Sequence, residues 1–278
     1  MDTEVVVGTA PGTALYLYII PDFDTKDILD AYNRVVSDDR VDALSSGFWG
    51  CEAQQPAFAK LSDHIAEQAA AQGETWAAVT GDAGAFPCSP SRADVTTPAS
   101  GPAFVAVGGT TLLTTIDGVY RSEWGLAADT YYGFVSSGGG VSSLFALPSY
   151  QKGVKHVLPS GRNVPDVSFD LNPGTGTSFF FQGAWEGPMG APYDGDALSS
   201  DLFCALLTEV DQVKGERVGD FHGALYDLFR KYGYGSPHDP LFHDVTRYNN
   251  GLYRAVPGYD QMTGIGSIDG WNFSQLVK

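Results

Sequence analysis

Short apolar runs alternate with amphipathic stretches along the first 115 residues, and the spacing predicts strands that alternate with helices. The strand-like runs are Glu4–Val7, Ala14–Ile20, Val41–Trp49, Thr75–Thr80, Phe104–Val107 and Thr111–Thr115. Apolar residues at helical spacing predict helices over Asp22–Val36 and Pro56–Ala71, the second stopped by Gly73. This β-α-β alternation predicts an α/β fold with a mainly parallel central sheet and helices on its faces.

The second half of the chain does not continue this regular alternation of strands and helices. Loops and short β segments fill the region from Gly118 to Ser200, and they include the aromatic stretches Tyr131-Tyr132 and Phe179–Phe181. Helices are predicted again at Ser200–Val213 and Asp220–Tyr232. No linker, repeat or low-complexity segment interrupts the chain, so we expect one domain over residues 1–278.

Composition and charge narrow the function classes. The chain is 43% hydrophobic, which is enough for a substantial core, and its net charge is −17. This charge disfavours nucleic acid and anionic membrane surfaces as partners. It fits a secreted protein working in acid, a protein in high salt, or ordinary acidic solubility. No apolar run reaches the roughly 18 residues of a membrane span. No basic segment followed by an apolar run opens the given sequence, so no signal peptide is visible in it.

The three cysteines are an odd number, so at least one thiol is unpaired within the chain. Cys204 lies on the apolar face of a predicted helix and is expected to be a buried free thiol. Cys51 and Cys88 each follow a predicted strand, so a disulfide between them is one hypothesis and two free thiols the other.

One stretch has the pattern of a catalytic turn and helix. Asp194–Val210 leads from small and polar residues into an apolar helix, for which Ser199 and Ser200 are N-cap candidates. A helix N-terminus favours developing negative charge, which suits a serine nucleophile. The five histidines show no zinc spacing, and His64 is expected at the surface of its helix.

Acidic residues in two turns are the other candidates. Asp82 follows a strand in a tight GDAG turn, where its side chain could simply cap the loop. Asp244 and Asp260 bracket a turn-rich loop, and two carboxylates with loop carbonyls would form an oxygen cage for Ca²⁺. Ordinary surface turns are the alternative for both.

Six motifs in order make the chain similar to the sedolisin family of serine-carboxyl peptidases. They are DTEVVVGTAPG at 2–12, TGDAG at 80–84, VGGT at 107–110, SGGGVSSLFALPSYQ at 137–151, GRNVPDVSFDLNPGTG at 161–176, and HDVTRYNNGLY followed by VPGYDQMTGIGS within 243–267. The resemblance runs essentially from end to end. It implies a subtilisin-like fold, calcium binding and a catalytic set of Glu, Asp and Ser.

The resemblance places these catalytic roles residue by residue. The Asp of the acid pair falls on Asp2, and its Glu partner would lie four residues earlier, before Met1. The oxyanion-hole Asp falls on Asp82, which could donate to an oxyanion only when protonated. The nucleophile position falls on Ala197, and Asp201 stands where the family has proline. Alanine has no oxygen with which to attack.

The resemblance also implies a calcium site and two alternative functions. Calcium ligands would be the carboxylates of Asp244 and Asp260 and the carbonyls of Val245, Val256 and Gly258. The first hypothesis is a pseudopeptidase: a secreted, extracellular, calcium-stabilised scaffold that binds a protein or peptide, with a homo-oligomer or assembly compatible with this role. The second is an active acid endopeptidase whose nucleophile has moved to Ser199, although a two-residue displacement would cost orders of magnitude in rate.

Overall fold

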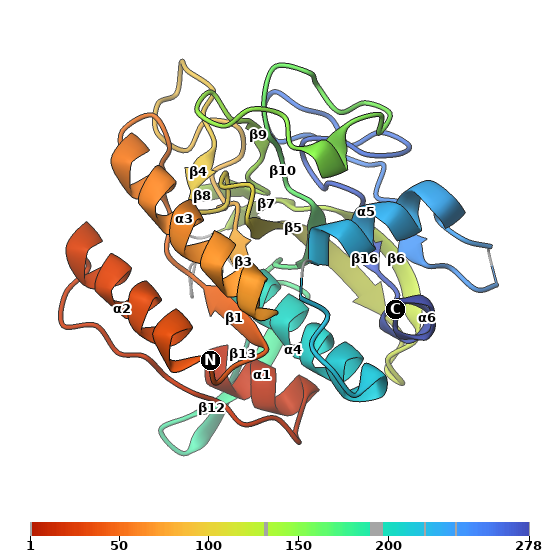
Figure 1. Cartoon of the computed structure of the whole chain (residues 1–278). Helices are drawn as coiled ribbons and strands as arrows, with labels where there is room; N and C mark the ends of the chain where they lie inside the picture. The colour runs from red at the N-terminus through yellow and green to blue at the C-terminus, as the bar shows by residue number, and fades with distance from the viewer. Residues whose placement is uncertain (1, 131–132, 190–196, 220, 237, 278) are drawn as a thin grey trace.

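A mainly parallel sheet forms the centre of the fold, as the alternating pattern predicts (Figure 1). The structure is a computed structural model that describes residues 2–130, 133–189, 197–219, 221–236 and 238–277. The strands of this sheet are β1 (Ala43–Ser46), β3 (Thr75–Val79), β5 (Phe104–Thr114), β11 (Val167–Asp170) and β6 (Tyr120–Gly125). Their order is β1-β3-β5-β11, all parallel, and β6 pairs antiparallel with β5.

Helices cover both faces of the sheet, because successive strand residues point to opposite sides. The helices are α1 (Asp2–Thr9), α2 (Thr25–Asp38), α3 (Pro56–Gln72), α4 (Ala197–Lys214), α5 (Phe221–Tyr232) and α6 (Gly270–Leu276), with a 3-10 turn η1 at Ser149–Gln151. Trp76 and Phe104 point into a core formed with α2 and α3. Ala77 and Val105 point the other way, into a core formed with α4, α5 and α6.

The ends of α2 and α3 carry residue types that favour helix starts and stops. Asp24 is the N-cap of α2, and its side chain accepts hydrogen bonds from the backbone N–H groups of Lys26 and Asp27, each at 2.9 Å. Pro56 stands in the first turn of α3. Gly73 ends that helix in the left-handed conformation, at φ 86°.

Small two-stranded sheets brace the loops around this centre. They are β2 (Gly50–Cys51) with β4 (Thr96–Thr97), β7 (Ala127–Thr130) with β8 (Gly133–Ser136), β9 (Gly140–Val141) with β10 (Asn163–Val164), β12 (Thr177–Phe181) with β13 (Ala184–Met189), and β15 (Phe242–His243) with β16 (Ser267–Ile268). The β12–β13 hairpin extends away from the body below α1 (Figure 1). Its side chains Phe180 and Trp185 are exposed and meet edge to face.

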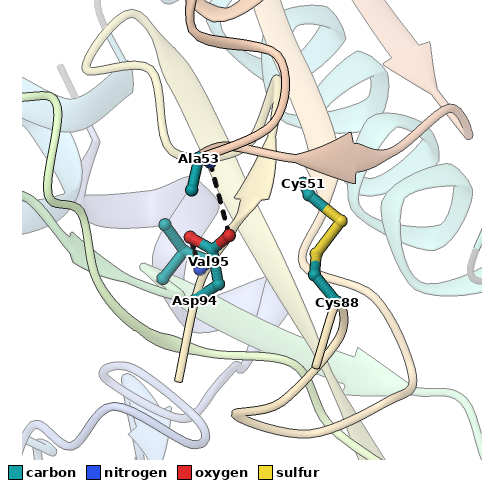
Figure 2. Close-up of a disulfide and its surroundings, with 5 residues drawn as sticks. All are labelled: Cys51, Ala53, Cys88, Asp94 and Val95. Carbon is teal, nitrogen blue, oxygen red and sulfur yellow. Dashed lines mark hydrogen bonds between the residues drawn. A yellow bond between two sulfur atoms is a disulfide. The ribbon is translucent and has the colours of Figure 1, made fainter. Parts of the chain in front are cut away.

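A disulfide joins Cys51 to Cys88, which confirms that hypothesis (Figure 2). Cys51 belongs to β2, and the bond ties this strand to the loop that leads toward β4. Asp94 fastens the same region, since its carboxylate accepts from the backbone N–H groups of Ala53 and Val95 (Figure 2). The remaining cysteine, Cys204, is free and buried, as expected.

A fully buried ion pair connects the sheet with α5. Arg162 and Asp166 are both 0% exposed, and the guanidinium contacts both carboxylate oxygens. Asp166 also accepts from the Tyr226 hydroxyl at 2.7 Å and from the Ala106 N–H at 2.8 Å. These donors compensate for the loss of water around the charge. Burial alone would raise the pKa of Asp166, but the charge of Arg162, with His222 beside it, holds this pKa well below its usual range.

The strand predictions near the N-terminus are wrong. Glu4–Val7 lies within the helix α1, which buries Val5 and packs along α4. Ala14–Ile20 forms no strand, and Leu17 and Ile19 are 66% and 89% exposed. Among the described residues, no backbone hydrogen bond joins residues 14–20 to another segment, so this apolar stretch has no neighbouring strand with which to pair.

Two further expectations need correction. The strands expected at Phe104–Val107 and Thr111–Thr115 are one strand, β5, which continues through Gly108 and Gly109. Those glycines allow close packing, because a Cβ on Gly108 would lie 2.6 Å from the Ser168 hydroxyl oxygen. The predicted helices Asp22–Val36, Pro56–Ala71, Ser200–Val213 and Asp220–Tyr232 are confirmed as α2, α3, α4 and α5, with shifted ends. The Tyr131-Tyr132 stretch lies outside the described residues.

Candidate active site

Asp2 and Ala197, two of the predicted catalytic positions, meet at one cavity. Ala197 begins α4 and is 5% exposed. A cavity of about 540 Å³ is lined by Ala197, by the exposed Asp2 of α1 and by Gly47, which follows β1. The contact between Ala197 and Gly47 is tight, since a Cβ built on Gly47 would lie 3.1 Å from the Ala197 Cβ. The start of α4 therefore lies at the carboxyl end of β1, the edge where open parallel sheets hold their sites.

Ser199 and Ser200 do not cap α4. The helix begins two residues before Ser199, and both serines are 0% exposed within it. The Ser200 hydroxyl bonds the Ala197 carbonyl at 3.0 Å and the Ser45 hydroxyl at 2.8 Å. The N-cap prediction is wrong because the helix starts earlier than the apolar periodicity indicates. The turn residues Asp194, Gly195 and Asp196 lie outside the described residues.

Asp82 lies in a turn against which the glycine-rich segment 137–140 packs closely. Its strand β3 ends at Val79, next to β1 in the sheet, so Asp82 shares the carboxyl edge with Gly47. The Asp82 carbonyl accepts from the Ser136 N–H at 2.7 Å. Gly138 approaches so closely that a Cβ there would lie 1.7 Å from the Thr80 carbonyl oxygen. This contact explains the glycine run, because only a residue without a side chain fits there.

Asp244 and Asp260 converge on the same short loop. The Asp244 carboxylate accepts from the Gly258 N–H at 3.2 Å, and the Asp260 carboxylate accepts from the Val256 N–H at 3.0 Å. Asp260 is buried and also accepts from the N–H groups of Met262 and Thr263. Burial raises the pKa of Asp260 to about 6 and also raises that of Asp244.

Comparison with solved structures finds a relative that shares the fold of the whole chain. The solved structure of Pseudomonas sedolisin, a serine-carboxyl proteinase complexed with two molecules of pseudo-iodotyrostatin, superposes with a TM-score of 0.85. It is 32% identical and covers 99% of this chain and 76% of its own. The chain belongs to the sedolisin family.

Sequence relatives support the same family. Sedolisin from Pseudomonas sp. (strain 101) is 33% identical over 100% of this chain and 48% of its own length. Kumamolisin from Bacillus sp. (strain MN-32) is 32% identical over 100% of this chain and 50% of its own length. The chain therefore spans about half the length of these curated relatives. No family model matches it.

More distant structures share the fold alone. A lanthipeptide protease superposes with a TM-score of 0.56 at 13% identity and covers 100% of this chain. The predicted subtilisin-like α/β fold is thus confirmed by the sedolisin structure and by the parallel sheet. Among the described residues we find no helix with both the length and the apolar character of a membrane span.

A sedolisin-like calcium site stays a prediction for the loop that holds Asp244 and Asp260. Both carboxylates turn toward residues 256–258, and a cation there would offset the cost of burying them. Val256 does not adopt the left-handed backbone, so valine can stand where the family has glycine. Within the described part of the chain, His, Cys, Asp and Glu side chains do not gather in threes around a metal position. Backbone carbonyls, with those of Val245 and Gly258 included, would supply the rest of the coordination.

Sequence reasoning missed the buried carboxyls of this sedolisin-like domain. Glu123 on β6 bonds the hydroxyls of Thr110 and Ser267, and burial raises its pKa to about 7. Asp170 on β11 accepts from the Thr175 hydroxyl, and burial raises its pKa to about 6. The only signal in the sequence is an acidic residue inside a short β segment. His64 is exposed and pairs with Glu67, as expected of a surface residue.

Proposed function

We propose that this sedolisin-family domain does not cleave peptides by the serine chemistry of its relatives and instead works as a secreted, calcium-stabilised scaffold that binds a protein or peptide. The observation that carries the proposal is Ala197. Its methyl group stands at the start of α4, in the cavity that Asp2 also lines, where the family resemblance expects the nucleophilic serine. The activity of the whole protein is part of the proposal, because the chain spans about half the length of its curated relatives.

The alternative function is an active acid endopeptidase with Ser199 as its nucleophile. The position of Ser199 gives this alternative little support. Its side chain is 0% exposed and does not line the cavity that holds Ala197. A nucleophile must reach the scissile carbonyl in a near-attack geometry, and Ser199 would have to leave a packed helix to do so. Ser200 is equally buried and is held by Ser45.

Asp82 remains compatible with either function. It is half-buried at the carboxyl edge of the sheet, where a protonated carboxyl could donate to an oxyanion. A scaffold would retain the same aspartate for its turn. The assignment of Asp2 and Asp82 as remnants of a catalytic set is therefore part of the proposal.

Two further features support an extracellular binding role. The Cys51–Cys88 disulfide is typical of proteins that fold in oxidising compartments. The exposed aromatic side chains of the β12–β13 hairpin, Phe180, Phe181 and Trp185, offer contact area of the kind found at protein interfaces. The net charge of −17 disfavours a nucleic-acid partner and leaves a protein or peptide as the proposed class.

Hydrolysis of a quenched fluorescent peptide library, measured from about pH 3 to 7, tests the proposal. Pseudomonas sedolisin serves as the positive control. We expect no turnover by the wild-type protein, and none by the Ser199→Ala variant. Turnover that disappears in Ser199→Ala, with an unchanged circular dichroism spectrum, would overturn the proposal. Turnover that survives Ser199→Ala but disappears in Asp82→Ala would also overturn it and would point to another nucleophile.

A further inference from the structure

A short loop between α4 and α5 lies against the turn that joins α3 to β3. It comprises residues 215–219, and we call it the strap. Figure 1 shows it passing beside the end of α3, and a Cβ built on Gly219 would lie 3.6 Å from the Gly73 Cα. Gly215 and Gly219, at its two ends, have the left-handed backbone, with φ 76° and 73°. Glycine adopts many backbone conformations without steric cost, so both ends can serve as hinges.

Arg217 fastens the strap to three other segments. Its guanidinium contacts the Asp39 carboxylate at 2.7 Å and the Asp42 carboxylate at 2.8 Å. It also donates to the Gln72 carbonyl at 3.2 Å. Asp39 is the C-cap of α2, Asp42 precedes β1, and Gln72 is the last residue of α3. One side chain therefore joins the strap to the ends of two helices and to the start of a strand of the central sheet.

Two hydrogen bonds hold the strap on the C-terminal side of Arg217. The Val218 N–H donates to the Asp211 carboxylate of α4 at 2.7 Å. The Thr75 hydroxyl donates to the Gly219 carbonyl at 2.7 Å. Val218 is also partly buried against the core that α4 and α5 cover. The closed strap thus covers the start of β3.

Glu74 lies beneath the strap without donors for its carboxyl group. The residue is 1% exposed, and among the described residues neither carboxyl oxygen has a hydrogen-bond partner. The side-chain oxygen of Gln72 lacks one as well. Arg217 lies over the same turn, since a Cβ on Gly73 would be 3.5 Å from its Cδ atom. A buried carboxylate without donors is costly, so the closed strap favours the protonated form of Glu74.

Acidic groups outnumber basic ones around Glu74 and the strap. The charged groups there are Asp39, Asp42, Asp211, Lys214, Glu216 and Arg217. Burial raises the pKa of Glu74 to about 7, and the charges of Asp39 and Asp42 add to the rise. Arg217 opposes it, as does the Val41 N–H, which lies near the carboxyl group without completing a hydrogen bond. Because Arg217 already contacts two carboxylates, it cannot fully compensate a third.

We propose that the strap is a pH-sensitive latch, which stays closed over a protonated Glu74 in acid and opens about its two glycines when Glu74 ionises near neutral pH. The closed strap binds the Glu74 proton more tightly than the open strap does. Its stabilisation is therefore complete below the ordinary pKa of about 4.5 and is lost as the pH rises through about 7. Burial raises the pKa of Asp211 to about 6, so this carboxyl acts in the same direction. Such a latch is independent of whether the domain hydrolyses peptides or only binds them.

Hydrogen exchange of the full chain between about pH 5 and 8 tests the latch, with rates corrected for the intrinsic pH dependence of exchange. Peptides over residues 215–219 report the strap, and peptides from β5 report global unfolding. Glu74→Gln and Glu74→Leu cannot ionise, and the first keeps the shape of the side chain. Glu216→Gln is their control, because it removes the same charge from an exposed position in the strap. Arg217→Gln removes the guanidinium that holds the strap. Circular dichroism shows which variants are folded.

In the wild type we expect protection of the strap to fall at least about tenfold from about pH 5 to 8, and trypsin to cut after Arg217 at the higher pH. Glu74→Gln and Glu74→Leu should keep the strap protected and resist trypsin, whereas Glu216→Gln should follow the wild type. Arg217→Gln should leave the strap unprotected even in acid. Constant protection in the wild type would overturn the proposal. So would a fall that both Glu74 variants retain, or one that the β5 peptides share, because the pH response would then lie elsewhere or be global.

Discussion

Glu123 should make this protein more stable in acid than at neutral pH. The side chain is 8% exposed on β6, and its carboxyl oxygens bond the hydroxyls of Thr110 and Ser267. Burial is the main cause that raises its pKa from 4.5 to about 7, and the nearby charge of Asp170 acts in the same direction. The two hydroxyl bonds oppose this change without cancelling it.

The sign and size of the effect follow from linkage. Because the folded protein holds the proton on Glu123 more tightly than the unfolded chain does, the stabilisation is complete below the unfolded pKa of about 4.5 and is lost as the pH rises through about 7. At 1.36 kcal/mol per pKa unit, the change corresponds to about 3 kcal/mol of unfolding free energy. The buried carboxyl of Asp63, whose pKa burial raises to about 6, contributes in the same direction.

Urea unfolding at intervals between about pH 4 and 8 measures this dependence. Glu123→Gln keeps the shape and hydrogen-bonding capacity but cannot ionise, so its unfolding free energy should fall by about 3 kcal/mol less than that of wild type over this range. Glu216→Gln, at an exposed position, should follow wild type. Parallel curves for wild type and Glu123→Gln would refute the reasoning, because the pH dependence would then arise elsewhere.

Two other predictions concern the calcium loop and the buried ion pair. Chelation should lower the melting temperature by several degrees, corresponding to about 3–4 kcal/mol for a tightly bound ion, and Asp244→Ala should abolish that response; an unchanged melting curve on chelation would contradict the site. Arg162→Met should cost about 3–5 kcal/mol in urea unfolding because it leaves the Asp166 carboxylate buried without the guanidinium that contacts both of its oxygens. Adding Asp166→Leu should recover most of that loss, and purely additive losses would count against the ion-pair explanation.

The sequence pattern was sufficient where local signals agree with the tertiary structure. Pro56 and Gly73 mark the ends of α3 within a residue or two, because both act through their own backbone conformation. It failed for α1, since the run Val5-Val6-Val7 has the same apolar character in a short helix as in a strand. The continuity of β5 through Gly108 depends on packing against Ser168, which is distant in sequence.

Some residues of the candidate site could be predicted from the sequence and others could not. Ala197 and Asp2 could be singled out from motifs, and the structure brings them to one cavity. The burial of Ser199 could not be predicted, because it depends on how α4 packs against the sheet and α1. Glu123 could not be predicted because a carboxyl in a short strand is normally exposed, and its two hydroxyl partners, Thr110 on β5 and Ser267 on β16, come together only in the fold.

The alkylation rate of Cys204 can report how often the packing around this residue opens. Two of the three cysteines are locked in the disulfide, so a single thiol remains to react with an alkylating reagent. Burial on α4 raises the pKa of that thiol, which slows modification of the closed molecule. Each alkylated chain, heavier by one adduct, would therefore record one opening of the packing between α4 and the sheet. Because Cys204 also lines the cavity that holds Ala197, a ligand bound in that cavity would slow the reaction without any label having been added to the protein.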